Sequence, residues 1–131
     1  MGQPAAKKGD RIMATDTHIV MIPSPGGPIP TPLPSPFVGE IDGELSQDVN
    51  IEGQAAATVG STATNRPSHI PQGGSFQSPP TDKGTIKMGS TTVFINGKAA
   101  ARNGDPAMTC NDPADLPVGS VLAVGMVSIG G

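Results

Sequence analysis

Three side chains of the types that bind transition metals follow turns of the same kind in this sequence. His18 and His69, the only two histidines, each lie nine residues after a glycine, Gly9 or Gly60. Cys110, the single cysteine, lies six residues after a third glycine. Imidazole nitrogen and thiolate sulfur are preferred ligands of Zn²⁺ in structural sites. Because each of the three is in register with a repeat and follows its glycine turn, we predict a common metal site rather than two unrelated histidines and a buried thiol.

The register comes from an internal repeat with an offset of 44 residues. VNIEGQAAATVGS at 49–61 aligns with VFINGKAAARNGD at 93–105, and residues 5–10 give a third copy whose strand half is missing. Each copy is expected to form a β-hairpin, because Val-x-Ile alternates like a half-buried strand and Asn96-Gly97 is a favoured two-residue turn. Glu52-Gly53 is a poorer turn. Three copies about an approximate threefold axis would bring the three metal-binding side chains together at one vertex.

The composition restricts both the fold and the partners. A chain of 131 residues is expected to form a single domain, residues 1–131, without enough length for a second core. It contains 18 Gly, 15 Pro and only three Phe, with neither Trp nor Tyr, so few large side chains can fill a core. Such a domain needs extensive backbone pairing, a metal or a partner. The net charge of −3 and the scattered Lys and Arg give no basic surface, which excludes nucleic acid as a partner.

These repeats, together with PAAKKGD at 4–10 and GSTTVFINGKAAARNGDPAMTC at 89–110, resemble the PAAR-repeat proteins, in the variant with a Pro-rich insertion after the first histidine. The resemblance covers nearly the whole chain. It implies an all-β fold: a small conical domain of three pseudo-threefold β-hairpin repeats with long irregular loops. A chain of this length leaves no room for a fused effector domain, so we expect no effector extension.

The resemblance further implies a structural function. Such a protein caps and sharpens the trimeric β-helical spike, a VgrG-like protein, of a contractile injection system, either a type VI secretion machine or a phage-like particle. It meets the spike through a flat base and aids penetration of the target membrane. Assembly would take place in the cytoplasm before secretion or injection, since the start MGQPAAKKGD lacks the apolar segment of a signal peptide. An adaptor that docks effector cargo to the spike is an alternative.

One structural zinc per chain, typically held by three His and one Cys, is implied by the same resemblance. Its ligands here would be His18, His69 and Cys110, and Ser35 stands where the Pro-rich segment would carry another histidine. A serine hydroxyl is a poor zinc ligand. The fourth position would then fall to water, to a carboxylate such as that of Asp16, Asp105 or Asp112, or to a backbone or other group. Iron in place of zinc, or a site that binds metal weakly or not at all, are the alternatives.

Two further segments have distinctive patterns. Residues 23–36, PSPGGPIPTPLPSP, contain seven prolines. Alternating proline favours polyproline II, so we expect a stiff surface loop that wraps the cone, with a recognition peptide for a proline-binding domain as the alternative. Residues 119–131 alternate well enough to form a strand that completes a sheet or part of the flat base.

The sequence does not favour an enzyme. A catalytic zinc needs a general acid or base beside its bound water. The three glutamates, at 40, 44 and 52, stand in no His-Glu context, and there is neither a Gly-x-Ser-x-Gly elbow nor a P-loop. A small zinc hydrolase with an open fourth metal position is kept only as an alternative function.

Overall fold

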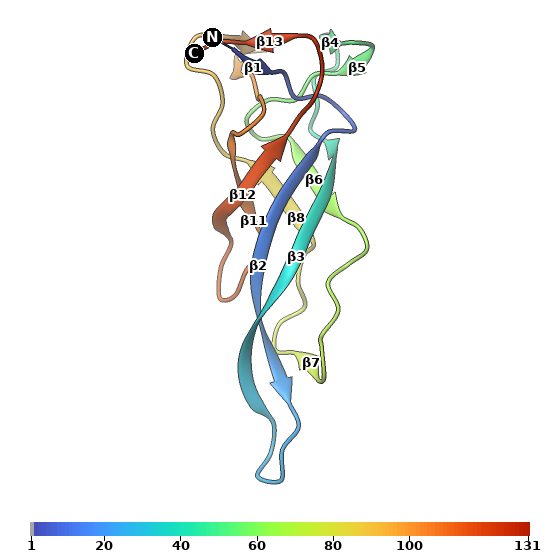
Figure 1. Cartoon of the computed structure of the whole chain (residues 1–131), viewed down its shortest axis with the longest axis vertical. Coiled ribbons are helices and arrows are strands. Elements are labelled where there is room, and N and C mark those ends of the chain that lie inside the picture. Colours follow the sequence, from blue (N-terminus) through green and yellow to red (C-terminus); the bar gives the residue numbers. More distant parts are fainter. Residues whose placement is uncertain (1) are drawn as a thin grey trace.

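The computed structural model describes residues 2–131 as a long, tapering body of β-strands, wide at the end that holds both chain ends (Figure 1). No helix occurs among these residues, so the predicted all-β fold is confirmed, and none of them forms a helix that could cross a membrane. The strands are β1 (Gln3–Pro4), β2 (Arg11–Ile22), β3 (Ile29–Gly43), β4 (Asn50–Ile51), β5 (Gln54–Ala55), β6 (Thr62–Asn65), β7 (Ser75–Phe76), β8 (Lys83–Ile86), β9 (Phe94–Ile95), β10 (Lys98–Ala99), β11 (Pro106–Thr109), β12 (Leu116–Leu122) and β13 (Ser128–Ile129).

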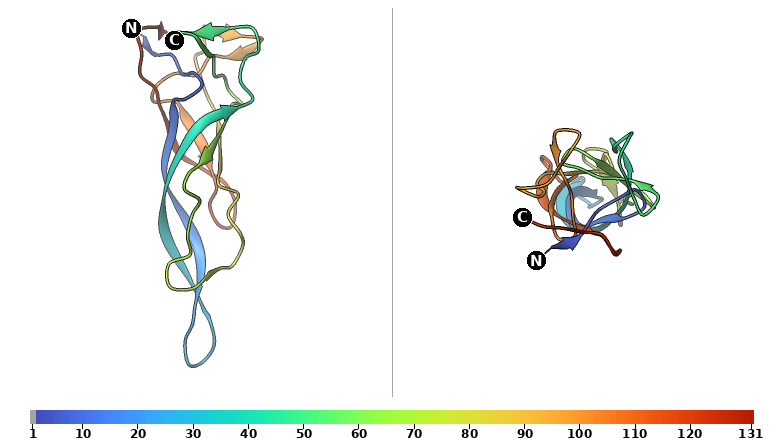
Figure 2. Two further views of the ribbon diagram at one scale, coloured as in Figure 1. Left: turned by 90° about the vertical axis from the view of Figure 1, so that its right-hand side faces the viewer. Right: turned by 90° about the horizontal axis from the view of Figure 1, so that it is seen from above.

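Three short β-hairpins form the wide end, one for each repeat. β4 with β5 and β9 with β10 pair in the same register, so that the isoleucine of each repeat faces the first residue after the turn. The third hairpin is assembled from distant parts of the chain: Ile129 of β13 faces Gln3 of β1 in that same register. The C-terminal segment therefore supplies the strand that the first copy lacks. Seen end-on, the three hairpins lie around the long axis (Figure 2).

A closed ring of hydrogen bonds joins the three repeats at this axis. The N–H of Ala6 donates to the carbonyl of Ala101 at 2.9 Å, and Ala101 donates to Ala57 at 3.1 Å. Ala57 donates back to Ala6 at 3.0 Å, which completes the ring. These alanines and the ones that precede them are at most 1% exposed. Only small side chains leave room for three backbones to meet, which explains the Ala-Ala pair in every copy.

The turn after each alanine pair is closed by its own polar side chain. The carboxylate of Asp10, the hydroxyl of Ser61 and the carboxylate of Asp105 each accept a hydrogen bond from the backbone N–H three residues earlier, at 3.0, 3.0 and 2.8 Å. The preceding glycines have φ values of 94°, 95° and 88°, a left-handed conformation that glycine adopts without strain. In each copy this glycine N–H donates to a carbonyl of the large sheet. The turns thus attach the base hairpins to the sheet at three equivalent points.

One seven-stranded antiparallel sheet extends from the base toward the narrow end. Its strand order is β12-β11-β8-β6-β3-β2-β7, and β12 also pairs with β2, which closes the wider part of the sheet around a core. The largest buried apolar side chains of that core are Phe37, Ile12, Ile41 and Ile86. Gly39 leaves room for the Phe37 ring, because a Cβ at position 39 would lie 2.6 Å from it. A single aromatic side chain therefore fills the centre of this core.

The Pro-rich segment is not the polyproline loop expected from the sequence. Residues 29–36 belong to β3, which pairs with β2 from Ile29 to Glu40 and forms a hairpin that projects at the narrow end (Figures 1 and 2). In an antiparallel pair every second residue directs its N–H away from the partner strand. The prolines at 30, 32, 34 and 36 occupy these outward positions, so no bond to β2 is lost. The alternation that suggested polyproline II is also one that the free edge of a hairpin tolerates.

Candidate metal site

The large sheet and two neighbouring segments position four potential metal ligands. Asp16 and His18 are two residues apart on β2, so both side chains point to one face of the strand, and the burial pattern places that face inside. His69 lies in the loop between β6 and β7, and Cys110 directly follows β11. The two histidines and the cysteine therefore converge, and an aspartate joins them. Contrary to the prediction, they do not lie at the vertex, because β2 and β3 continue beyond His18 as a paired hairpin.

The donor atoms of these four side chains all lie within 4.8 Å of one another. His69 Nε2 is 2.8 Å from Asp16 Oδ2. Cys110 Sγ is 3.5 Å from the same oxygen and 3.6 Å from His18 Nε2. Asp16, His18 and Cys110 are at most 2% exposed, and His69 is 9% exposed. The result is a compact, buried set of two nitrogens, one oxygen and one sulfur.

Hydrogen bonds from outside the cluster orient Asp16 and His69. The hydroxyl of Thr109 donates to Asp16 Oδ1 at 2.5 Å. Asn65 Nδ2 lies 3.3 Å from His69 Nδ1, which leaves Nε2 of the ring facing Asp16. Asp82 Oδ1 accepts from both the backbone N–H of His69, at 2.9 Å, and from Asn65 Nδ2, at 3.0 Å. The loop that carries His69 is therefore anchored through polar side chains on both of its flanks.

His18 has an unusual environment at its other ring nitrogen. Nδ1 is buried without a hydrogen-bond partner, and the carboxylate oxygen Oδ2 of Asp112 stands 3.5 Å away. This oxygen also accepts a hydrogen bond from the backbone N–H of Ile19 at 2.8 Å. A carboxylate beside Nδ1 favours a proton on that nitrogen and leaves Nε2 free to bind a metal.

The electrostatics of the cluster also favour a cation. Burial and, after it, the negative charge of Asp16 raise the pKa of the Cys110 thiol from 9.0 to about 11. In the metal-free protein the thiol is therefore protonated at neutral pH. A bound divalent cation reverses this preference, because a coordinating thiol loses its proton outright. Two acidic groups buried 3.5 Å apart are the arrangement that such a cation stabilises.

The donor set fits Zn²⁺. Zinc binds nitrogen, oxygen and sulfur at about 2.0–2.3 Å in tetrahedral structural sites, which places its ligand atoms about 3.3–3.8 Å apart. Two of the separations between donors, 3.5 and 3.6 Å, already fall within that range. Two histidines with a carboxylate are also ligands that iron accepts, so the residues alone leave iron as the alternative metal.

The other candidates from the sequence lie outside the cluster. Ser35 is directly opposite Asp16 in the β2–β3 ladder and is 8% exposed, so it stands beside the site. Asp105 does not belong to the site, because its carboxylate closes a base turn through its contacts with Arg102. Asp112 stands beside the outer nitrogen of His18. Among the three carboxylates considered from the sequence, Asp16 is the one that joins the histidines and the cysteine.

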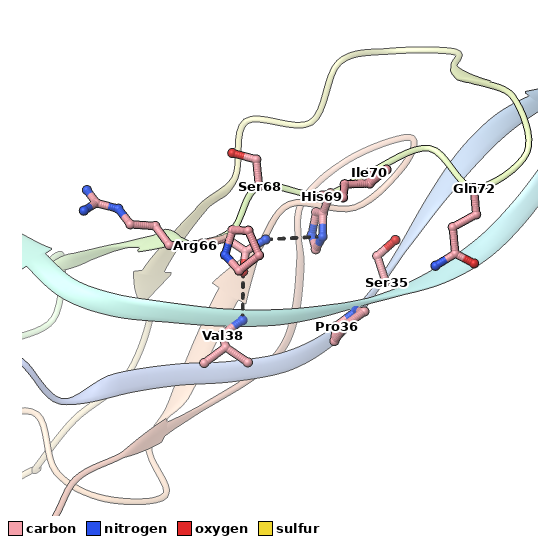
Figure 3. A pocket seen from close by; sticks show the side chains of 10 residues that line it. Ser35, Pro36, Val38, Arg66, Ser68, His69, Ile70 and Gln72 are labelled. Carbon is pink, nitrogen blue, oxygen red and sulfur yellow. Dashed lines mark hydrogen bonds between the residues drawn. The ribbon is translucent and has the colours of Figure 1, made fainter.

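A cavity of about 450 Å³ opens next to the cluster, between β3 and the loop at 66–72 (Figure 3). Ser35 and His69 form part of its wall, and most of the remaining lining is apolar, from residues such as Val38 and Ile70. His69, the most exposed of the four potential ligands, is the one that reaches this cavity.

Sequence reasoning did not find the residues that support the site. Thr109, Asn65 and Asp82 are polar residues in strands and loops, and no spacing in the sequence marks them as partners of the ligands. Asp16 carried a usable signal, because an Asp-x-His spacing within a strand places both side chains on one face.

The family model described as PAAR motif matches residues 20–113 of the chain. The matched range includes both complete base hairpins, almost all of the projecting hairpin, and two of the four potential ligands, His69 and Cys110. No curated protein and no solved structure matches the sequence. Since the match extends over more than half of the chain and agrees with the observed repeats, the protein belongs to the PAAR motif family.

Proposed function

We propose that this protein is the metal-stabilised tip that caps and sharpens the trimeric β-helical spike of a contractile injection system. Membership of the PAAR family implies a spike-tip role in type VI secretion, binding to the VgrG spike and delivery with that system. The family is structural rather than catalytic. Contact with effector cargo and with the target membrane is part of the same proposal.

The observation that carries the proposal is the ring of three equivalent hairpins at the wide end. A single chain with three matching hairpins can meet a threefold partner with one hairpin near each subunit. Several large apolar side chains of this end are exposed to between 36% and 93%: Val93, Phe94, Val124, Met126 and Val127. Exposed apolar groups gathered at one end of a small protein are typical of a docking surface.

The metal assignment that we propose is one structural zinc per chain, bound by Asp16, His18, His69 and Cys110. Its support is the donor set, the burial of the four side chains and the carboxylate beside His18. When bound, the metal supplies a positive charge that holds β2, the His69 loop and the end of β11 together. Structural zinc contributes on the order of 10–16 kcal/mol in small peptide sites, which is comparable with the stability of a typical domain.

The docking proposal is tested with the trimeric spike protein. Native mass spectrometry should give one chain of this protein per spike trimer. Phe94→Asp, on β9 of the base, should weaken the complex at least tenfold, because it places a charge in an apolar contact. Ile70→Asp is the matched control, since Ile70 is also exposed, at 69%, but lies beside the cavity of the metal site. Equal affinity for all three proteins would contradict docking through the base.

Metal analysis tests the site assignment separately. Protein purified without added metal should contain about one zinc per chain, and Cys110→Ser should contain little. A wild-type protein free of metal after incubation with zinc and desalting would show that the site does not hold the ion.

A further inference from the structure

The narrow end of the molecule is a hairpin without charge. Residues 17–39 contain no Asp, Glu, Lys or Arg, so all the charged side chains of the chain lie outside this segment. His18 is its single titratable group and is buried in the metal site. Beyond that site the two strands continue to Ile22 and Ile29, and the turn between them is the far end of the molecule (Figures 1 and 2). Its exposed surface consists mainly of proline and Ile29, which is 53% exposed.

The free edge of β3 has no backbone N–H to offer along this hairpin. The outward positions of the strand are the even-numbered ones, and the four from 30 to 36 are all proline. The next outward residue is Val38, whose N–H donates to Asn65 Oδ1 at 2.9 Å. The outward groups that remain along residues 30–36 are carbonyl acceptors.

The outer edge of β2 is also closed. Thr17 N–H donates to Asn111 Oδ1 at 2.7 Å, and Ile19 N–H donates to Asp112 Oδ2 at 2.8 Å. Met21 lies opposite Ser75 of β7 in the sheet. Both edges of the hairpin therefore lack open backbone donors from the metal site almost to the turn.

We propose that this distal hairpin, residues 19–33, inserts into the headgroup–acyl boundary of a lipid bilayer. The inference rests on the proposed function, and it names lipid as the medium that the narrow end meets. A surface without charge complements a medium that excludes charge, whereas each unsatisfied backbone donor costs several kcal/mol in the hydrocarbon region. The outward carbonyls need hydrogen-bond donors, so the hairpin stays at the acyl boundary, where water still reaches them.

A proline-recognising protein domain fits this segment less well. Such domains bind an isolated polyproline II strand, in which both sides of the backbone are free. Residues 29–36 are instead paired with β2 along every position, and extraction of the strand would break the hairpin that carries the metal ligands Asp16 and His18.

The absence of tryptophan allows a direct test. Ile29→Trp places one fluorophore on the hairpin, and Phe94→Trp places one on the base as a control. With vesicles of phosphatidylcholine and phosphatidylglycerol, we expect a blue shift for Ile29→Trp, and strong quenching by lipids brominated near the headgroup end of the chains. The emission of Phe94→Trp should not change. An unchanged emission of Ile29→Trp would overturn the proposal, while metal content and spike binding would report on the proposed function independently.

Two substitutions at one exposed position separate the parts of the argument, both made with the Ile29→Trp reporter. Pro30→Asp adds a charge and a free N–H, and it should weaken vesicle binding at least tenfold. Pro30→Val restores the N–H without adding a charge or a hydroxyl, so it should weaken binding by a smaller factor. Vesicle binding that survives Pro30→Asp unchanged would refute insertion of the hairpin. The same variants should retain zinc, which shows that the hairpin still folds.

Discussion

Replacing Asp16 by asparagine tests whether its carboxylate is the fourth metal ligand. Asp16 is fully buried, and asparagine has nearly the same size, so packing should be preserved. The asparagine carbonyl can still accept the hydrogen bond that Thr109 now donates to Oδ1. What changes is the negative charge and the second oxygen, the atom that contacts His69 and Cys110.

The expected effect depends on whether the metal is bound. Loss of a group that merely supports a ligand lowers metal affinity by about 10–100-fold, so loss of a ligand should reach at least the upper figure. A factor of 100 equals about 2.8 kcal/mol, and with zinc in excess this appears in the free energy of unfolding. For a chain of this size that lowers the Tm by about 10 °C. In the metal-free protein, removal of a buried charge should leave the Tm unchanged or raise it.

The assay is thermal unfolding of wild type and Asp16→Asn, each with excess zinc and with chelator. Asp105→Asn is the matched control, because Asp105 closes a base turn and accepts hydrogen bonds from Arg102. Its substitution should lower the Tm by the same amount in both conditions. If Asp16→Asn behaves like this control, its carboxylate acts through packing alone and is not a ligand.

Three further outcomes are expected. In the metal-free protein the pKa of the Cys110 thiol is raised from 9.0 to about 11, so the folded state holds the thiol proton more tightly than the unfolded state does. The protonated thiol therefore stabilises the fold fully below pH 9, and this stabilisation is lost between pH 9 and 11. Urea unfolding should show a loss of at most about 3 kcal/mol over that range, absent in Cys110→Ser. Ala57→Leu should cost at least about 1–3 kcal/mol in a denaturant titration, because three backbones meet there, whereas Ala55→Leu at a half-buried position should be nearly neutral. A circular permutant that joins Gly131 directly to Gln3, with new ends in the exposed loop before β8, should fold and bind zinc. Gly-Gly would then form the turn of the third hairpin, as two residues form the turns of the other two. A permutant without native-like circular dichroism would contradict the equivalence of the three hairpins.

The sequence predicted the features that depend on local repetition. The offset of 44 residues identified two base hairpins, and each histidine and the cysteine follows the glycine turn of one copy of the repeat. It did not reveal that VSIGG near the C-terminus matches VFING, because the two halves of the third hairpin lie at opposite ends of the chain. That pairing depends on a contact over the whole sequence, which no local pattern encodes.

The Pro-rich segment shows the opposite difficulty. Its alternation is compatible with an isolated polyproline helix and with the outer edge of a hairpin, since both tolerate a missing N–H at every second residue. The strand that pairs with the Pro-rich segment, β2, decides between them. Its 12 residues make it longer than the strands that the repeat predicts. The sequence left Asp16 as one of three candidate carboxylates for a related reason: Asp16 and His18 share a face only once both are known to lie within one continuous strand.

The ring formed by Ala6, Ala57 and Ala101 has a consequence for local motion. An ordinary strand ladder has a last bond, and opening of the ladder begins there. A cycle of three bonds has no last member, so none can open without displacing the junction of all three repeats. The amides of the ring should therefore exchange with solvent only on global unfolding and at one common rate. The hairpin turns around it can open separately, which leaves the wide end pliable at its rim and fixed at its centre.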